Sequence, residues 1–124
     1  MKYLLVGYGN IGRKRKAILG ERCVATVDPF NAEADFKTPE GCPPEKYDAV
    51  ILATPNQMKL ELLEHFIKLK KHVLIEKPLL FPDEATGRRF ERLAQDHGVL
   101  WYTSYNHRFE PLIANLKSHL EAGR

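Results

Sequence analysis

Short apolar runs, separated by glycines and by helix-like segments, set the pattern of this chain. The runs at residues 3–6, 24–27, 49–53 and 73–75 contain no alternating polar positions, and a further strand is expected at 99–103. A strand without polar alternation is buried on both faces, as in a parallel sheet. The runs therefore predict parallel strands that are covered on both sides.

Segments with helical spacing lie between these runs. The apolar residues expected to mark the buried helix faces are Ile11, Ile18 and Leu19, then Met58, Leu62, Leu63, Phe66 and Ile67, then Phe90, Leu93 and Ala94. Gly20 is expected to end the first helix, Asn56 to be the N-cap of the second, and Gly98 to stop a third helix that begins near Asp83. Alternating strands and helices predict an α/β Rossmann fold, with a doubly wound, mainly parallel open sheet and helices on both faces.

Two segments depart from this alternation. Residues 29–46 contain four prolines and few apolar positions, so we expect mostly loop, without a helix of three turns. Residues 111–123 place Leu112, Leu116 and Leu120 on one helical face. That face needs a partner, and self-association through this helix is one way to cover it.

The composition limits the classes of protein. With 44% apolar residues and a net charge of +3, residues 1–124 suit one globular domain. Every apolar run is far shorter than the roughly 20 residues of a membrane span, so we expect a soluble, cytoplasmic protein without a membrane partner. The cysteines and histidines show no metal-ligand spacing. The basic block at residues 13–16 points in four directions around a helix, which favours a solvated surface over a nucleic-acid site.

The first strand leads into a glycine-rich turn at the start of a helix. In G-x-G-x-x-G, Gly7 permits the sharp turn, Gly9 lets a pyrophosphate approach the backbone, and Gly12 allows close packing of helix and strand. Asp28 follows the second strand, about 20 residues on, where a carboxylate accepts hydrogen bonds from ribose hydroxyls. The pair favours dinucleotide binding over a purely structural turn. Asp28 favours NAD as the cofactor, while NADP stays open because Arg13 or Lys14 can reach a 2′-phosphate.

Two further motifs follow strands at the edge where open α/β sheets bind ligands. They are Thr54-Pro55-Asn56 and Glu76-Lys77-Pro78. With GYGNIGR, VDP, DAVILATPN, KHVLIEKPL and YNHRFEPL in the same order, the chain resembles the glucose-fructose oxidoreductase, inositol dehydrogenase and rhizopine-catabolism (Gfo/Idh/MocA) family from end to end.

The resemblance implies a set of site residues. In that family the T-P-N turn lies along the cofactor, and the lysine of E-K-P, here Lys77, sits beside nicotinamide and substrate as the catalytic candidate, in a lysine-proline peptide that is commonly cis. Asn106 and Arg108 would line the same cleft. The resemblance assigns no role to His107, whose position beside them suits either a replacement proton acceptor or an exposed loop. The expected cofactor-binding residues are Gly7, Gly9, Asn10, Ile11, Gly12, Asp28, Thr54, Pro55, Asn56, Glu76, Lys77, Asn106 and Arg108.

The chain also departs from the family pattern. The segment from Asp28 to Asp48 is too short for the usual helix and strand, so we expect a reduced sheet. The chain ends at Arg124, without the family's C-terminal α+β substrate domain, which usually supplies a histidine proton acceptor. We therefore expect the cofactor domain of an NAD(P)-dependent sugar, cyclitol or nucleotide-sugar dehydrogenase, inactive without a second domain. Two alternatives are a non-catalytic dinucleotide sensor or regulator and a chaperone-like or scaffold fragment that uses the last helix.

Overall fold

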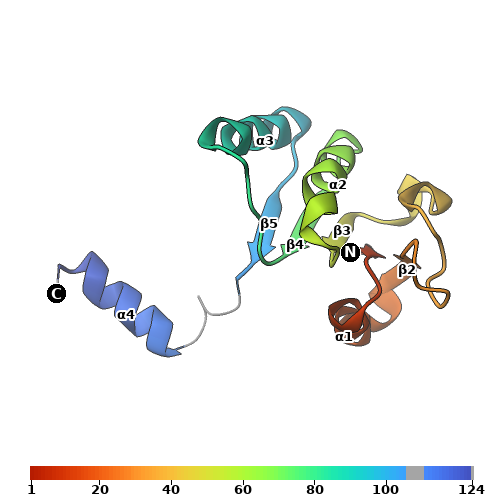
Figure 1. Ribbon diagram of the computed structural model, residues 1–124, viewed down its shortest axis with the longest axis horizontal. Helices are drawn as coiled ribbons and strands as arrows, with labels where there is room; N and C mark the ends of the chain where they lie inside the picture. The colour runs from red at the N-terminus through yellow and green to blue at the C-terminus, as the bar shows by residue number, and fades with distance from the viewer. Residues whose placement is uncertain (106–110, 124) are drawn as a thin grey trace.

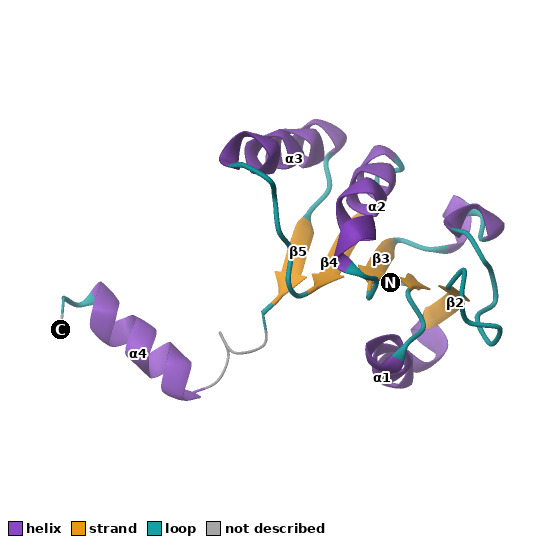
Figure 2. Ribbon diagram, viewed as in Figure 1, coloured by secondary structure: helices purple, strands orange, loops and turns teal. Residues whose placement is uncertain are grey.

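One parallel sheet is the framework of the domain (Figures 1 and 2). The computed structural model describes residues 1–105 and 111–123, and in these residues five strands are ordered β2-β1-β3-β4-β5, with every neighbouring pair parallel. The strands are β1 (Tyr3–Val6), β2 (Cys23–Val27), β3 (Ala49–Leu52), β4 (His72–Glu76) and β5 (Trp101–Ser104). The predicted doubly wound α/β fold is confirmed.

Helices cover both faces of this sheet. They are α1 (Asn10–Leu19), α2 (Asn56–Lys68) and α3 (Glu84–His97), and a fourth helix, α4 (Pro111–Glu121), comes after β5 in the chain. Figure 1 shows α2 and α3 on one side of the sheet and α1 on the other. Asp83 caps α3 by accepting a hydrogen bond from the Thr86 amide, and Gly98 ends it in the left-handed conformation with φ 68°.

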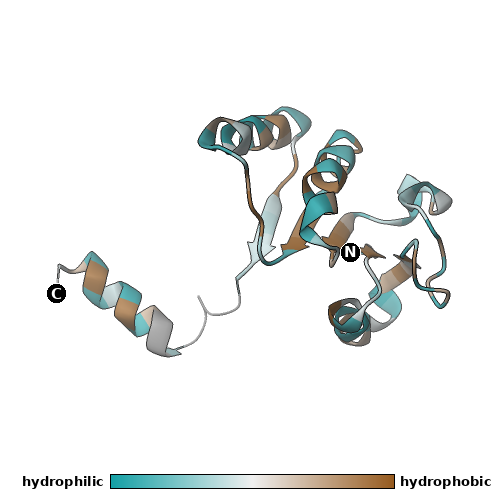
Figure 3. Ribbon diagram, viewed as in Figure 1, coloured by the Kyte–Doolittle hydropathy of each residue, from teal (hydrophilic) through white to brown (hydrophobic). Residues whose placement is uncertain are grey.

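The main core lies between the sheet and the pair α2 and α3. Alternate residues of the central strands point into it, among them Leu4, Val50 and Ile75, and the helices add Phe66 and Phe90. Burying a side chain of this size stabilises the fold by about 1.5–3 kcal/mol. Figure 3 shows the central strands as hydrophobic and β5, at the edge of the sheet, as paler.

The inner face of α1 differs from the prediction. Ile11 and Ile18 are 45% and 67% exposed, so the expected burial of these two side chains is wrong. Instead, α1 approaches the sheet at Gly12, which is buried and which lies so close to the carbonyl oxygen of Gly7 that a Cβ would collide with it. A glycine contact replaces an apolar ridge, because the helix must lie against the turn that precedes it.

The last strand begins later than predicted, at Trp101 instead of Val99. The amide of Val99 donates to the carbonyl oxygen of Ala94 at 3.0 Å, and the amide of Gly98 donates to Gln95 at 3.1 Å. These are hydrogen bonds of the helix C-cap. Val99 therefore completes the end of α3, and pairing with β4 starts two residues further on.

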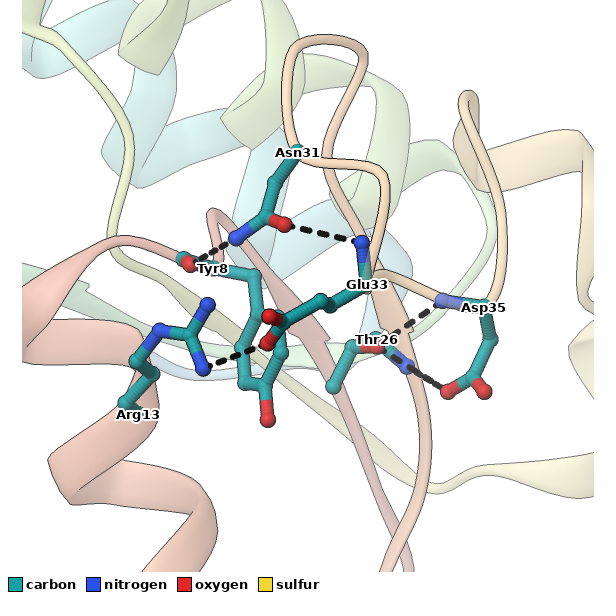
Figure 4. Close-up of polar contacts among 6 residues, drawn as sticks. All are labelled: Tyr8, Arg13, Thr26, Asn31, Glu33 and Asp35. Atoms are coloured by element: carbon teal, nitrogen blue, oxygen red, sulfur yellow. Dashed lines mark hydrogen bonds and ion pairs between the residues drawn. The ribbon is translucent and has the colours of Figure 1, made fainter.

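Residues 29–46 are mostly loop, as predicted, with short 3-10 turns at Pro39–Gly41 and Pro44–Lys46. Phe36 forms an isolated bridge with Val27 and extends the sheet by one residue. The carboxylate of Asp35 accepts hydrogen bonds from the amide and hydroxyl of Thr26, at 2.8 and 3.0 Å (Figure 4). The reduced sheet is thus confirmed, and the loop itself supplies hydrogen-bond partners to the edge of β2.

Helix α4 stands apart from the sheet in Figure 1, and Leu116 and Leu120 are 53% and 66% exposed. Its self-association stays a prediction. Within the described ranges, no helix has the length and apolar content needed to span a bilayer, and no cluster of three His, Cys, Asp or Glu side chains is arranged to hold a metal ion.

Candidate cofactor site

The glycine turn connects β1 to α1 and needs glycine at two places. Gly7 has φ +96°, and a Cβ there would collide with the carbonyl oxygen of Ala53 at the end of β3. Gly12 lies against Gly7, as described above. Gly9 is different, because a Cβ at this position would meet no heavy atom within 4 Å. Its missing side chain keeps space open outside the fold.

The start of α1 faces this open space. Its N-cap is Gly9, no side chain of the described residues caps it, and its first turn carries no acidic residue. The first intrahelical hydrogen bond runs from the Arg13 amide to the carbonyl oxygen of Gly9, at 2.9 Å. The amides of Asn10 and Ile11 precede it at the positive end of the helix dipole, an arrangement that suits a phosphate.

The carboxylate of Asp28 is fixed by the backbone around it. One oxygen accepts a hydrogen bond from the Tyr8 amide at 2.9 Å, and the other accepts from the amides of Phe30 and Asn31, at 2.8 and 3.2 Å. Partial burial disfavours the charge, but these three donors outweigh it and lower the pKa of Asp28 below its ordinary value of 3.8. The residue therefore presents an oriented, ionised carboxylate beside the glycine turn.

A cavity of about 250 Å³ lies between the glycine turn and the ends of β2 and β3. It is lined by Val6, Gly7, Gly9, Asp28, Pro29, Phe30, Ala53, Thr54, Pro55 and Met58. Five of the predicted cofactor residues thus meet at one place. The hydroxyl of Thr54 is buried there and has no hydrogen-bond partner among the described residues. A bound polar ligand can satisfy it.

The prediction that Asn56 is the N-cap of α2 is wrong. Asn56 is the first helical residue, and Pro55 holds the N-cap position. Its side-chain oxygen instead accepts a hydrogen bond from Lys59 Nζ at 3.0 Å. The same ammonium donates to the carbonyl oxygens of Glu76 and Pro78, at 2.6 and 2.8 Å. All three donors of Lys59 are therefore used, and they tie the T-P-N turn to the E-K-P segment.

Lys59 was not among the predicted site residues, and only 2% of its surface is exposed. Burial lowers its pKa, and the charge of Glu76 partly offsets this effect. The sequence does contain a signal for it. Lys59 precedes the buried Leu63 by four residues, so it is a charged residue in line with the apolar face of α2. Such a residue is buried only where several acceptors are provided for it.

Glu76 is also buried, and its carboxylate pairs with the guanidinium of Arg15 from α1. This pairing is the first cause of the raised pKa of Arg15. A second nitrogen of Arg15 lies 3.5 Å from the hydroxyl of Ser104, at the end of β5. The interpretation of residues 13–16 as a solvated surface therefore holds for the exposed Arg13, Lys14 and Lys16 but is wrong for Arg15.

Lys77 follows β4 directly and is exposed, and its peptide bond to Pro78 is cis, as the resemblance implied. It lies outside the lining of the 250 Å³ cavity but is bracketed by the two carbonyl groups that bind Lys59. Three residues of the Y-N-H-R motif, Asn106, His107 and Arg108, lie outside the described residues.

Comparisons with known proteins agree with this geometry. The model of the Gfo/Idh/MocA family, described as an oxidoreductase family with an NAD-binding Rossmann fold, matches residues 17–105. Inositol 2-dehydrogenase from Rhizobium meliloti is 28% identical over the whole chain, which covers 42% of that protein. Inositol 2-dehydrogenase 4 from Saccharopolyspora erythraea is 34% identical, with 96% of this chain and 40% of the relative covered.

One relative carries NADP in its name: D-xylose 1-dehydrogenase [NADP(+)] from Haloarcula marismortui, 32% identical over 68% of this chain and 23% of the relative. Among solved structures, a myo-inositol dehydrogenase described as putative from Sinorhizobium meliloti superposes with a TM-score of 0.77 at 27% identity, over 100% of this chain and 42% of that one. The chain thus spans less than half the length of these relatives. With its parallel sheet, glycine turn and matching family model, this chain belongs to the Gfo/Idh/MocA oxidoreductase family and is an NAD-binding Rossmann domain of it.

Proposed function

We propose that this chain is the cofactor half of a dehydrogenase that transfers hydride between a nicotinamide dinucleotide and a hydroxyl-bearing carbon of a sugar, cyclitol or nucleotide-sugar. One observation carries the proposal: residues from three separate motifs line one cavity at the C-terminal edge of the sheet. Ligands of open α/β sheets bind at this edge. The inositol and xylose dehydrogenases among the relatives support the class of substrate.

The residues of the site fit the parts of the cofactor. The open space at Gly9 and the free amides of α1 suit the pyrophosphate, and the fixed carboxylate of Asp28 suits the adenosine ribose. Phe30 and Met58 supply apolar surface for the adenine. The unsatisfied hydroxyl of Thr54 would gain a partner on binding. Asp28 opposes a 2′-phosphate, so we expect NAD to bind more tightly than NADP.

The bound dinucleotide supplies the acceptor for a hydride, and the substrate hydroxyl must lose its proton in the same oxidation so that a carbonyl forms. We assign Lys77 to the substrate oxygen, where its ammonium donates a hydrogen bond. Lys59 holds the backbone on both sides of it. We assign the proton acceptor and the substrate pocket to a second domain, because the matched relatives are more than twice as long as this chain.

Replacing Gly9 with alanine tests the binding site directly. With φ −83°, position 9 accepts an alanine, and its Cβ would meet no protein atom, so the unfolding free energy should change by no more than about 1 kcal/mol. The methyl group would occupy the space proposed for the pyrophosphate. Calorimetric titration should therefore show NAD binding weakened at least about tenfold, a cost of roughly 1.4 kcal/mol.

Gly87→Ala is the matched control, because it adds the same methyl group within α3, 3.4 Å from the ring of Phe81 and outside the cavity lining. Its NAD affinity should equal that of the unmodified chain. Equal NAD affinity of the Gly9→Ala variant, with the fold intact, would contradict the proposed site.

A further inference from the structure

An ion pair lies beside the carboxylate that we assign to the ribose. Arg13 Nη1 of α1 is 2.8 Å from Glu33 Oε2 in the loop after β2 (Figure 4). The guanidinium also lies over the ring of Tyr8, 4.7 Å from its centre. Both partners are partly open to solvent, with side-chain exposures of 46% and 68%. An incoming ligand can therefore reach them.

The same residues are connected to Asp28. The amide of Tyr8 donates to one oxygen of Asp28, and Asn31 donates to the other through its backbone amide. The side chain of Asn31 then bridges the two loops, because its nitrogen donates to the Tyr8 carbonyl at 2.7 Å and its oxygen accepts from the Glu33 amide at 2.9 Å. The loop that carries Glu33 is thereby fixed against the glycine turn, next to Asp28.

We propose that Glu33 determines the choice between NAD and NADP by occupying Arg13. This inference rests on the proposed function, in which Asp28 binds the adenosine ribose. A 2′-phosphate on that ribose would need a cation, and a guanidinium binds phosphate through two parallel hydrogen bonds. Arg13 lies against the loop that follows Asp28, and its charge is already paired there with Glu33. A 2′-phosphate must displace this carboxylate and then lie near two negative charges, those of Glu33 and Asp28.

A basic residue near the ribose can either bind a 2′-phosphate or be held in an ion pair within the protein. If Arg13 were available, the domain would accept NADP in spite of Asp28. Because Glu33 pairs with it, the effect of Arg13 on the preference should appear only when Glu33 has lost its charge. The two residues should therefore be coupled in NADP binding and nearly independent in NAD binding, which has no 2′-phosphate.

Calorimetric titration of NAD and NADP with four chains tests this coupling: the unmodified chain, Glu33→Gln, Arg13→Met and the double variant. Glu33→Gln should lower the ratio of the two dissociation constants, NADP over NAD, about three- to fivefold at low ionic strength, as expected for a partly exposed charge pair. Arg13→Met should leave the ratio close to that of the unmodified chain. The double variant should return to it, and about 1 M salt should reduce the effect of Glu33→Gln by screening.

Glu21→Gln is the matched control, since it removes the same charge from an exposed position in the short turn Gly20–Arg22. An equal shift in this control would overturn the inference, because net charge would then explain the result. NAD binding with an unchanged ratio in Glu33→Gln would also overturn it while leaving the proposed function standing. Failure of the unmodified chain to bind either dinucleotide would overturn the proposed function and this inference together.

Discussion

Replacing Lys59 with methionine should destabilise the domain by about 2–4 kcal/mol. The variant keeps a long apolar stem but leaves three acceptors without the ammonium: the carbonyl oxygens of Glu76 and Pro78 and the side-chain oxygen of Asn56. The hydrogen bond to Glu76 is fully buried, so its acceptor cannot turn to water, and an unsatisfied buried acceptor costs about 1–3 kcal/mol. The other two acceptors are only partly buried.

One contribution to the free energy of unfolding favours the Lys59→Met variant. Burial lowers the pKa of Lys59, so holding this ammonium in the fold itself costs free energy, and methionine removes that cost. This is why we expect less than the sum of three lost hydrogen bonds. Domains of this kind are stable by only about 5–15 kcal/mol, so the expected loss is a large fraction of the total.

Urea unfolding followed by the fluorescence of Trp101, the single tryptophan, measures the difference. Lys68→Met is the matched control on the same helix, because the Lys68 side chain is 57% exposed and pairs with Glu64, four residues earlier. Its cost should be about 0.5 kcal/mol or less. Lys59→Gln retains an amide donor and should lie between the two. A cost for Lys59→Met no larger than that of Lys68→Met would refute the role given to Lys59.

Two other predictions concern Asp28 and Lys77. Because the pKa of folded Asp28 lies below its ordinary value of 3.8, its charge stabilises the fold above that pH, and this contribution is lost as the pH falls through the lowered pKa. Acid unfolding of Asp28→Asn should therefore depend less on pH below about pH 4, and an unchanged acid profile would contradict the hydrogen bonds described for Asp28. The isolated 124-residue chain should bind NAD but should not reduce it with inositols or glucose, because positioning of substrate and base contributes about 7–11 kcal/mol of barrier lowering. Turnover by the isolated chain that Lys77→Ala abolishes, recorded as NADH absorbance, would refute this half-enzyme assignment.

Much of the fold follows from local sequence signals. The limits of α3 were predicted nearly to the residue, because an aspartate at the N-cap and a glycine at the C-terminus each satisfy helix-end groups locally. The inner face of α1 could not be predicted in this way. Its contact with the sheet depends on the close approach of Gly12 to Gly7, and apolar periodicity carries no information on such an approach.

In the candidate site, too, local motifs predicted some residues, whereas contacts between distant segments determine others. The glycine turn, Asp28 and the T-P-N turn were placed from motifs, because each follows a strand and parallel strands end at a common edge. Arg15 and Lys59 were missed. Their partners lie 61 and 17 residues away in the sequence, and a single sequence contains no record of which acceptor a long side chain will reach. The topology of the sheet determines which acceptors these two side chains reach.

Glu76 is the point at which these two cations meet. Arg15, from the helix on one face of the sheet, binds its carboxylate, and Lys59, from a helix on the other face, binds its carbonyl oxygen. The backbone that enters Lys77 is thus held from both faces, while the side chain of Lys77 remains exposed. Ordering a lysine side chain costs up to about 2 kcal/mol, whereas the backbone cost has already been met in folding. If Lys77 binds the substrate oxygen as proposed, substrate binding would have to order only its side chain, because the buried Lys59 and the partly buried Arg15 already hold the segment before it.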